Sequence, residues 1–331
     1  MAPEVFRSPV AFWLKAFLEI RRAAGRDLAG NAKIVRYLDR FLLAELTPGQ
    51  PITREIAEKW VADMQHLSPG TRSNRIGILR QFCLYLSHFD PRTCIIHQLI
   101  PPCRTHPSPY IYSSSEVRQI LAAARRIGPS GSFRPTVIST VIGLLYSMGL
   151  RIGEALKLKL RDIDIRRRVI EIREGKFKKS RYVPMTRSTA EHLSAYLCQR
   201  EKAGFSVAPD SFVFVTQRGS GYKHPEFTTV FLAILRNAGI RGPKGQRGPR
   251  IHDLRHTFAV NRLLAWYRQG VNLGAKLPLL STYMGHCTVT GTQVYLQATA
   301  ELLESAGRRF HEHFAVPPFG KKSHGKSCFS N

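Results

Sequence analysis

The stretch IHDLRHTF, residues 251–258, carries two histidines and an arginine at a spacing that could do chemistry. His252 and His256 are four residues apart, so a helix would place both imidazoles on one face, where a zinc site could begin. Arg255 would share that face and would suit an anion, because guanidinium and imidazole groups both donate hydrogen bonds to phosphate oxygens. A zinc ion beside Arg255 would carry a large electrostatic cost, which makes zinc the weaker interpretation. A core histidine with a solvated arginine fits these eight residues as well as an anion site does.

Other residues with possible chemical roles lie in three further motifs. In GLRIGEAL, Arg151 follows the Gly-Leu that ends an apolar stretch, and Glu154 could orient the arginine or simply pair with it. In EGKFKKSRYVP, Lys176 lies at an expected hairpin turn, from which a lysine can reach a ligand. In YMGHCTVTGTQVYL, His286 follows a glycine and Tyr295 comes nine residues later. Each motif alone is weak, since a structural histidine or a half-buried packing tyrosine would explain it equally well.

The composition indicates a polyanion as the partner. The 331 residues include 50 Lys and Arg against 23 Asp and Glu, a formal net charge of +27. Such an excess repels itself in a compact fold and is typical of proteins that bind nucleic acid. An anionic membrane surface is the weaker alternative. No stretch approaches the roughly 20 apolar residues that cross a bilayer.

The cysteines and the N-terminus predict an intracellular setting. The six cysteines form no CxxC pair, so neither a zinc ribbon nor a disulfide framework is indicated. The N-terminus lacks the continuous apolar core and the small-residue cleavage site of a signal peptide. We therefore expect a cytoplasmic, bacterial protein associated with the nucleoid.

The hydrophobic periodicity divides the chain into two parts. Residues 9–99 read as helices, and Thr53 is expected to cap one of them. The segment IPPCRTHPSPYIYSSSE breaks this pattern with four prolines, which indicates a linker with Ser114 or Ser115 capping the next helix. Beyond it we expect a buried helix ending at Gly149, a hairpin from RVIEIRE and SRYVPM, and another short strand in FVFV. Further helices are expected at 187–203, 226–238, 253–268, 277–284 and 299–314.

Basic residues in three segments could contact DNA phosphates, with a solvated charged face as the alternative for each. The expected helix in SPGTRSNRIGILRQFCLYLSHF is basic in its first turns and apolar later. The expected hairpin turn is rich in lysine. The loop RGPKGQRGPR, which precedes His252, carries four positive charges and no acid. The candidate DNA-binding residues are Arg72, Arg75, Arg80, Lys178, Lys179, Arg247 and Arg250.

The order Arg, Lys, His-x-x-Arg, His, Tyr along the chain resembles the tyrosine recombinases, also called phage-type integrases. The resemblance rests on GLRIGEAL, HDLRHTFA and MGHCTVTGTQVYL and spans the second part of the chain, while the helical first part looks like the family's core-binding module. It implies a mainly α fold with a small β-sheet in the catalytic domain, arranged as a two-domain clamp around DNA. The expected parts are a helical core-binding domain (1–100), a linker (101–112), a catalytic domain (113–315) and a basic tail (316–331).

The resemblance also implies a mechanism. Tyr295 would attack a DNA phosphodiester and form a 3′-phosphotyrosine intermediate, by which the enzyme cleaves and rejoins strands. A phenol, with a pKa of about 10, leaves readily enough for the reverse step, so neither a metal nor another cofactor is expected. The other implied roles are phosphate binding for Arg151, Arg255 and His286, assistance in proton transfer for His252, and protonation of the leaving 5′-oxygen for Lys176.

Some positions depart from the family pattern or leave alternatives open. Lys178 and Lys179 compete with Lys176 as the general acid, because the sequence does not fix the hairpin register. Met284 replaces the usual leucine before Gly-His, a mild apolar exchange. The stretch AWYRQGVNLGAK is longer than usual and predicts an extended loop. His256 lies outside the core set and is expected to be structural, packing or hydrogen bonding beside the site.

Two other functions remain as alternatives: a type IB topoisomerase, which shares this chemistry but relaxes supercoils as a monomer, and a DNA-binding protein with an inactive site. The helical first domain and the HDLRH motif favour the recombinase. The resemblance implies a homotetramer on double-stranded DNA recombination sites. Each protomer would pass its C-terminal segment AELLESAGRRFHEHF to a neighbour, with an ordinary closing helix of its own domain as the alternative. The basic surplus and the longer loop favour an enzyme of a mobile genetic element.

Overall fold

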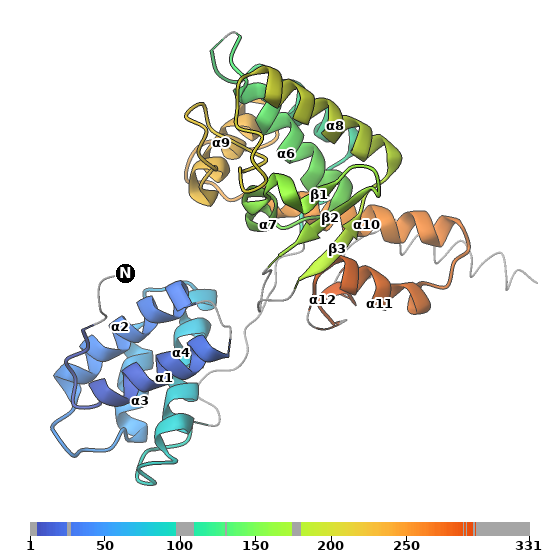
Figure 1. Ribbon diagram of the computed structural model, residues 1–331. Helices are drawn as coiled ribbons and strands as arrows, with labels where there is room; N and C mark the ends of the chain where they lie inside the picture. The colour runs from blue at the N-terminus through green and yellow to red at the C-terminus, as the bar shows by residue number, and fades with distance from the viewer. Residues whose placement is uncertain are drawn as a thin grey trace, which may run out of the picture. The chain divides into compact units, whose positions relative to one another are not determined.

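The structure is a computed structural model, and it describes residues 5–24, 28–96, 109–129, 131–173, 180–286, 288, 290–293 and 295. The chain forms two compact units, and of the described residues those up to 96 belong to the first and those from 109 onwards to the second. Figure 1 shows the elements of each unit. Within the described ranges, no helix is long and apolar enough to cross a membrane.

The first unit is helical, as its periodicity predicts. Its elements are α1 (Ala11–Ala23), α2 (Leu28–Glu45), α3 (Arg54–Asp63) and α4 (Pro69–Leu86). Apolar residues three or four positions apart face a common core, which includes Leu14 and Phe17 of α1, Leu38 of α2 and Phe82 of α4. The Thr53 side chain accepts a hydrogen bond from the backbone N–H of Ile56, so the predicted cap of α3 is confirmed.

The second unit is mainly helical with a small sheet, which confirms the expected fold class. Its helices before the sheet are α5 (Ser114–Ala124), α6 (Arg134–Met148), α7 (Ile152–Lys157) and the 3₁₀ turn η1 (Leu160–Asp162). The strands are β1 (Ile163–Asp164), β2 (Val169–Ile172) and β3 (Arg181–Pro184). The remaining helices are α8 (Arg187–Lys202), α9 (His224–Asn237), α10 (His252–Arg268), α11 (Leu273–Met284) and α12 (Thr290–Gln293).

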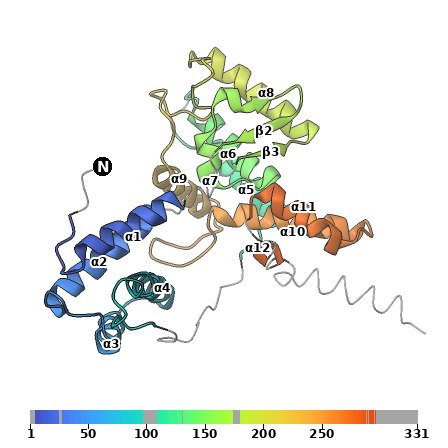
Figure 2. The same cartoon turned by 60° about the horizontal axis from the view of Figure 1, so that its bottom comes forward.

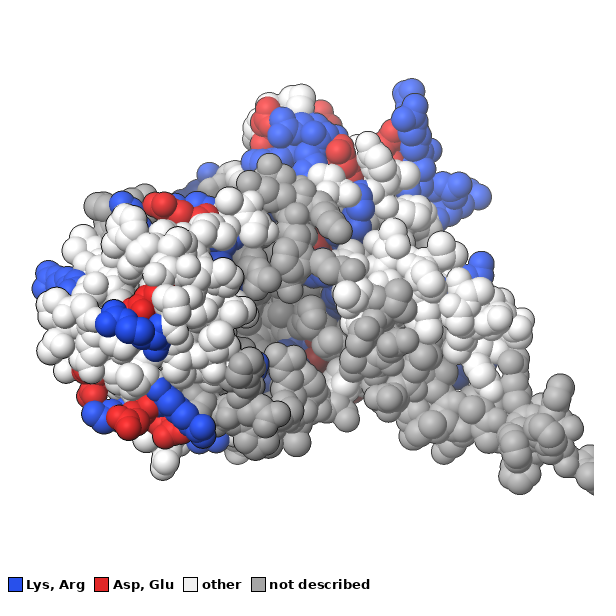
Figure 3. Space-filling model, turned by 90° about the horizontal axis from the view of Figure 1, so that it is seen from below, with Lys and Arg blue, Asp and Glu red and all other residues white. Residues whose placement is uncertain are grey.

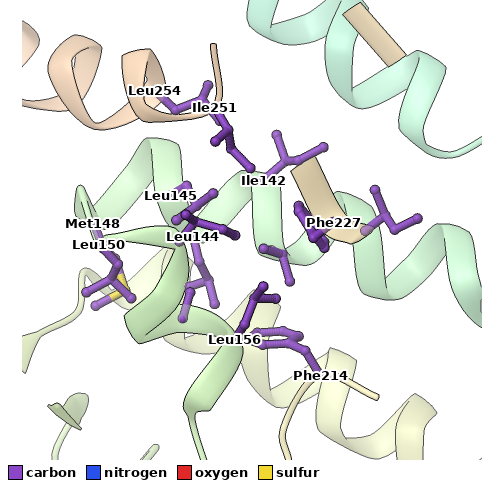
Figure 4. Packing of buried hydrophobic residues seen from close by; sticks show 14 of the residues in the cluster. Ile142, Leu144, Leu145, Met148, Leu150, Leu156, Phe214, Phe227, Ile251 and Leu254 are labelled. Carbon is purple, nitrogen blue, oxygen red and sulfur yellow. The ribbon is translucent and has the colours of Figure 1, made fainter. Parts of the chain in front are cut away.

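Helix α6 is the centre of this unit because it is apolar on most of its surface. It packs against α5, α7, α8 and α10. Figure 4 shows Leu145 and Met148 of α6 in a core that also receives Leu156 from α7, Phe227 from α9 and Leu254 from α10. Burial of such side chains stabilises the fold by about 1.5–3 kcal/mol each. The core therefore holds the C-terminal end of α6 and the N-terminal end of α10 in fixed positions.

The predicted hairpin is present as two strands of a three-stranded antiparallel sheet in the order β1-β2-β3. Ile170 pairs with Val183, and both side chains are buried, whereas Tyr182 on the opposite face of β3 is exposed. The register thus fixes which residues of β3 turn towards α11, with which this strand is in contact. The turn between β2 and β3, with Lys176, lies outside the described residues.

Some local expectations are wrong. The cap of α5 is Ser113 rather than Ser114 or Ser115, because Ser113 forms a reciprocal capping box with Glu116. The FVFV stretch forms only isolated bridges, Lys159 with Phe212 and Val215 with Gly221.

The extended loop expected in AWYRQGVNLGAK is also absent. Instead α10 runs on to Arg268, Gly270 adopts a positive φ of 74°, and the side chain of Asn272 caps α11. Figure 2 shows α10 and α11 next to each other, joined by this short connection. The predicted helix over 299–314 lies outside the described residues.

Gly149 ends α6 in a left-handed conformation, with φ 62° and ψ 26°. We expect Gly149→Ala to destabilise the protein by about 2 kcal/mol or more, because a side chain is strained at this φ and its Cβ would lie 2.3 Å from Cδ1 of Phe258. Urea unfolding measures the change. The control is Gly143→Ala in the same helix, whose Cβ would meet nothing within 4 Å and which should be neutral or slightly stabilising. Equal stability of Gly149→Ala and the parent would contradict this account of the turn.

Candidate functional site

Arg151 is positioned by the turn that joins α6 to α7. Gly149 stops α6, and Arg151 is the residue before the first turn of α7. The Glu154 carboxylate accepts hydrogen bonds from the backbone N–H of Arg151 (3.1 Å) and from its Nη1 (2.7 Å). The sequence left open whether Glu154 orients Arg151 or merely pairs with it. In the structure it does both, since one carboxylate holds the backbone and the side chain of the same arginine.

Arg255 lies in the first turns of α10 and is 1% exposed. Its Nη1 donates to the carbonyl of Gly149 at 2.5 Å, and its Nη2 donates to the carbonyl of Met284 at 2.6 Å. Both acceptors are carbonyls at the C-terminal ends of helices, where the helix dipole favours a positive charge. A buried guanidinium is therefore held by the ends of α6 and α11.

The two arginines that the sequence singled out converge on the same helix end. Arg151 Nη2 donates to the carbonyl of Gly285 at 2.6 Å, and Arg255 binds the adjacent carbonyl of Met284. Burial lowers the pKa of Arg255 to about 10, and the positive charge of Arg151 acts in the same direction. Two like charges packed together in this way form a site that favours an anion.

Arg181 is a residue that the sequence analysis missed. It projects from β3, where its Nη1 and Nη2 donate to the two oxygens of Glu154 at 3.1 and 2.9 Å, and its Nε donates to the carbonyl of Tyr283. Burial alone would raise the pKa of Glu154, but the hydrogen bonds and charges of Arg181 and Arg151 outweigh it and lower the pKa to about 2. In the sequence, Arg181 is marked only by its place in the expected strand SRYVPM, which follows the lysine-rich hairpin turn.

Three histidines lie around these arginines. The rings of His252 and His256 meet edge to face, with centroids 4.7 Å apart. His286, just beyond the end of α11, has its Nδ1 2.8 Å from Thr292 Oγ1. Burial is the main cause that lowers the pKa of each of the three to about 4, and nearby arginine charges add to it. All three imidazoles are therefore neutral at pH 7.

Tyr295 lies against these imidazoles and is 3% exposed. Its hydroxyl is 2.9 Å from His256 Nδ1, and its ring stacks on that of His286 with centroids 6.3 Å apart. Burial raises the pKa of the phenol, while the charges of Arg255 and Arg151 oppose that rise. The predicted tyrosine is thus brought to the arginines and histidines. His256, expected only beside the site, is in hydrogen-bond contact with it.

The described part of the chain contains no group of three or more His, Cys, Asp or Glu side chains that could hold a metal ion. His252 and His256 instead share their surroundings with Arg255 and Arg151, whose charges help to lower the pKa of His252. The donor set suits an anion rather than a cation. Of the residues implied for the site, Arg151, His252, Arg255, His286 and Tyr295 lie together, and Lys176 is outside the described residues.

The predicted DNA-binding residues differ in their exposure and in their contacts within the protein. Arg80 donates through Nε to the carbonyl of Ile96, and Arg75 lies over the ring of Tyr37 at 4.3 Å, so both have roles within the first unit. Arg72 is half-buried on α4, whereas Arg247 is exposed; Arg250 is also exposed but pairs through Nη2 with Oδ1 of Asp253 at 3.3 Å. Lys178 and Lys179 lie outside the described residues.

Pairing of the acidic groups leaves much of the basic surplus uncompensated. Exposed pairs include Arg54 with Glu58, Lys59 with Glu45 and Arg187 with Glu191. On the face drawn in Figure 3, the red acidic atoms lie close to blue basic ones. Since the sequence holds 50 basic residues and only 23 acidic ones, pairing of this kind cannot cancel the positive charge.

Comparison with known proteins gives relatives over most of the chain. The model of the Phage integrase family matches residues 112–301. The chain is 36% identical over 305 residues to y4rB, a Sinorhizobium fredii protein named as an integrase/recombinase, covering 91% of this chain and 96% of the relative. It is 28% identical over 318 residues to tyrosine recombinase XerD of Caulobacter vibrioides, covering 94% of this chain and 97% of that protein.

Solved structures share the fold. The Tn1549 transposon integrase in complex with transposon right end DNA has a TM-score of 0.68 and 20% identity, covering 94% of this chain and all of that one. The XerH site-specific recombinase bound to its palindromic difH substrate has a TM-score of 0.65 and 22% identity, covering 90% of this chain and 84% of that one. At these identities the likeness concerns the fold.

We expect Glu154→Gln to lower the free energy of unfolding by about 3 kcal/mol at pH 7, because the neutral amide no longer balances two guanidinium charges. The folded-state pKa of Glu154 is depressed to about 2, so its contribution is present above the unfolded value near 4.5 and is lost as the pH falls towards 2. Unfolding titrations of parent and variant from pH 7 to pH 2 should therefore converge.

The matched control is Glu191→Gln, which breaks an exposed ion pair with Arg187 and should change stability by less than about 1 kcal/mol. A difference between Glu154→Gln and the parent that stays constant down to pH 2 would show that the carboxylate charge is not the cause.

Proposed function

This chain belongs to the phage integrase family, the tyrosine recombinases, and we propose that it cleaves and rejoins double-stranded DNA at specific sites with Tyr295 as the nucleophile. The single observation that carries the proposal is the convergence of Arg151, Arg255 and three imidazoles around one buried phenol. Membership of the family supplies the reaction class, and the residues of this chain supply the groups it needs.

The proposed reaction begins when the Tyr295 Oη attacks a phosphorus of the DNA backbone. A bond forms between Oη and phosphorus, the bond from phosphorus to the 5′-oxygen breaks, and a 3′-phosphotyrosine link keeps the energy of the original bond. Arg151 and Arg255 neutralise the non-bridging oxygens as negative charge builds up on them. Attack by a 5′-hydroxyl reverses the sequence and rejoins a strand.

The remaining roles concern hydrogen bonds and protons. His252 and His286, neutral at pH 7, would each donate one hydrogen bond to the phosphate or its leaving oxygen. The leaving 5′-oxygen is strongly basic and requires a proton, which we assign to Lys176, with Lys178 and Lys179 as the alternatives. Arg181 would act through Glu154, by holding Arg151 at the angle that faces the phosphate.

The same surplus of positive charge supports a DNA interface beyond the scissile phosphate. Exposed Arg247 and Arg250 in the loop before α10, with Arg72 on α4, are the proposed contacts to the DNA backbone. Arg75 and Arg80 would contribute charge in addition to their contacts within the first unit. The surplus also supports a role in a mobile genetic element, which we propose as the biological setting.

We further propose that four copies act together on two DNA sites. An apolar pocket of about 340 Å³ in the second unit supports this part of the proposal. It lies between the end of α6, α10 and α11, with Leu279 59% exposed at its edge. The segment 300–314 of a neighbouring copy, which is rich in leucine and phenylalanine, would fill it.

Tyr295→Phe should abolish a covalent protein–DNA adduct that the parent forms on a nicked duplex selected for binding from a random pool. The reason is that the phenol oxygen is the only atom removed, while the ring and its stacking on His286 remain. The adduct is measured as DNA that migrates with the protein after denaturation. Tyr182→Phe, on the exposed face of β3, is the control and should react as the parent does.

An adduct in Tyr295→Phe would exclude this residue as the nucleophile. The same preparation is incubated with a supercoiled plasmid that lacks the selected site. Rapid and complete relaxation of that plasmid would instead favour a type IB topoisomerase.

Leu279→Glu should weaken assembly of four protomers on two sites while leaving the binding of one protomer to a half-site intact, because a carboxylate at the rim opposes apolar docking. The mass of the protein–DNA complex in solution is the readout. Val207→Glu, which alters another exposed apolar residue of the same unit, is the control. If Leu279→Glu still assembles as four protomers on two sites, the pocket does not take part in assembly.

A further inference from the structure

The hydrogen bond between His256 and Tyr295 is unexplained by the roles assigned so far. His256 Nδ1 lies 2.9 Å from the Tyr295 hydroxyl, and their ring centroids are 5.4 Å apart. The tyrosine is 3% exposed, and its burial raises the pKa of the phenol. A neutral phenol is a weak nucleophile, so a group that accepts its proton is needed when it attacks phosphorus. The inference below rests on the proposed function, in which Tyr295 is that nucleophile.

The second nitrogen of His256 determines what the first can do. Nε2 lies 4.0 Å from Oδ1 of the buried Asp253. Arg250 donates to both oxygens of this carboxylate, from its backbone N–H to Oδ2 at 2.7 Å and from Nη2 to Oδ1 at 3.3 Å. A neutral imidazole carries one N–H, and the negative charge of Asp253 favours it on Nε2. Nδ1 is then an acceptor, and the phenol must be the donor of the 2.9 Å bond.

The other two imidazoles are less well placed for this role. His286 faces Tyr295 by stacking of the rings, and its Nδ1 is engaged with Thr292 Oγ1. His252 contacts the ring of His256 edge to face. Among the described residues it forms no hydrogen bond with the phenol. His256 is thus the imidazole within proton-transfer distance of Oη.

The surroundings keep His256 unprotonated at pH 7, so a ring nitrogen with a lone pair is present before the reaction. Burial and the charges of Arg250 and Arg255 lower the pKa of His256 to about 4, so its Nδ1 lone pair is free at pH 7. The protonated form that follows transfer is opposed by burial and by those arginines, and the carboxylate that faces it is Asp253, with Oδ1 4.0 Å from Nε2. The titratable and charged groups that face this ring are Arg250, His252, Asp253 and Arg255 on α10 and the turn before it, with His286 and Tyr295 from the chain after α11.

We propose that His256 is the general base that takes the phenolic proton of Tyr295 during strand cleavage, with Asp253 stabilising the resulting imidazolium. The Oη–H bond breaks and its proton moves to Nδ1, the electron pair of Oη forms the bond to phosphorus, and the bond from phosphorus to the 5′-oxygen breaks. That oxygen takes its proton from the general acid. On rejoining, the phosphorus–Oη bond breaks and Nδ1 returns the proton to Oη.

The test measures single-turnover formation of the covalent adduct by the full chain on the selected nicked duplex. His256→Ala should slow the reaction at pH 7 by about 100-fold or more, with DNA affinity within about twofold of the parent. His256→Asn should be similarly slow, because an amide oxygen accepts a hydrogen bond but does not take up a proton. His192→Ala, which removes an exposed histidine of α8, should react at the parent rate.

Two further readouts separate a proton acceptor from a merely structural residue. Between pH 6 and 9 the parent rate should be flat, whereas the His256→Ala rate should rise about tenfold per pH unit as hydroxide takes over removal of the proton. On a duplex with sulfur in place of the bridging 5′-oxygen, whose leaving group needs no proton, His256→Ala should stay slow. A variant of the lysine that serves as general acid should recover on that duplex.

A full parent rate in His256→Asn would overturn the proposal, since the hydrogen bond alone would then be sufficient. A flat pH profile in a slow but DNA-binding His256→Ala would also overturn it. Both results leave the proposed function standing as long as the parent forms an adduct and Tyr295→Phe does not. Absence of an adduct in the parent would refute the proposed function itself.

Discussion

The site depends on the carbonyl oxygens at two helix ends, which allow two guanidinium groups to lie side by side. Like charges at this distance repel, and the lowered pKa of Arg255 records that repulsion together with burial. The carbonyls of Gly149, Met284 and Gly285 supply partial negative charge in fixed positions, and Glu154 supplies a full negative charge to Arg151. These oxygens accept hydrogen bonds from both arginines and so reduce the cost of burying their charges.

Packing of a few elements of the second unit holds these ends together. Arg255 and Gly149 are 106 positions apart in the sequence, and Arg151 and Gly285 are 134 apart. Packing of α6 against α10 brings Gly149 and Arg255 together. Contact of α11 with α10 and β3 holds Gly285 near Arg151. The close fit between Gly149 and the ring of Phe258 leaves no room for a side chain at this junction. Catalytic geometry in this fold is therefore a property of the apolar core.

The sequence was most informative where the determining signals are local. The end of α6 at Gly149, the pairing of Arg151 with Glu154 and the shared face of His252 and Arg255 all follow from spacing within one turn of helix. The loop expected after α10 was wrong although local signals were present, because Gly270 ends one helix and Asn272 caps the next. The length of this stretch compared with the family pattern predicted its structure less well than the capping residues Gly270 and Asn272 did.

Contacts between distant segments could not be read in the same way. Arg181 reaches Glu154 because of the register of β3 and its approach to α11, neither of which spacing along the chain reveals. The bond between His256 and Tyr295 depends on where the chain packs after α11, so the sequence placed His256 near the site without its partner. In both cases the sequence shows the residue type but not the residue that it contacts.

The three neutral imidazoles have a consequence for the robustness of the enzyme in a living cell. The lowered pKa values of the three imidazoles, about 4 each, and the pKa of about 10 for Arg255 leave the charge of these four groups constant across the intervening range. A fall of one or two pH units below 7 would therefore leave the charge of these groups unaltered. Burial has removed from these histidines the pH sensitivity for which the residue is best known.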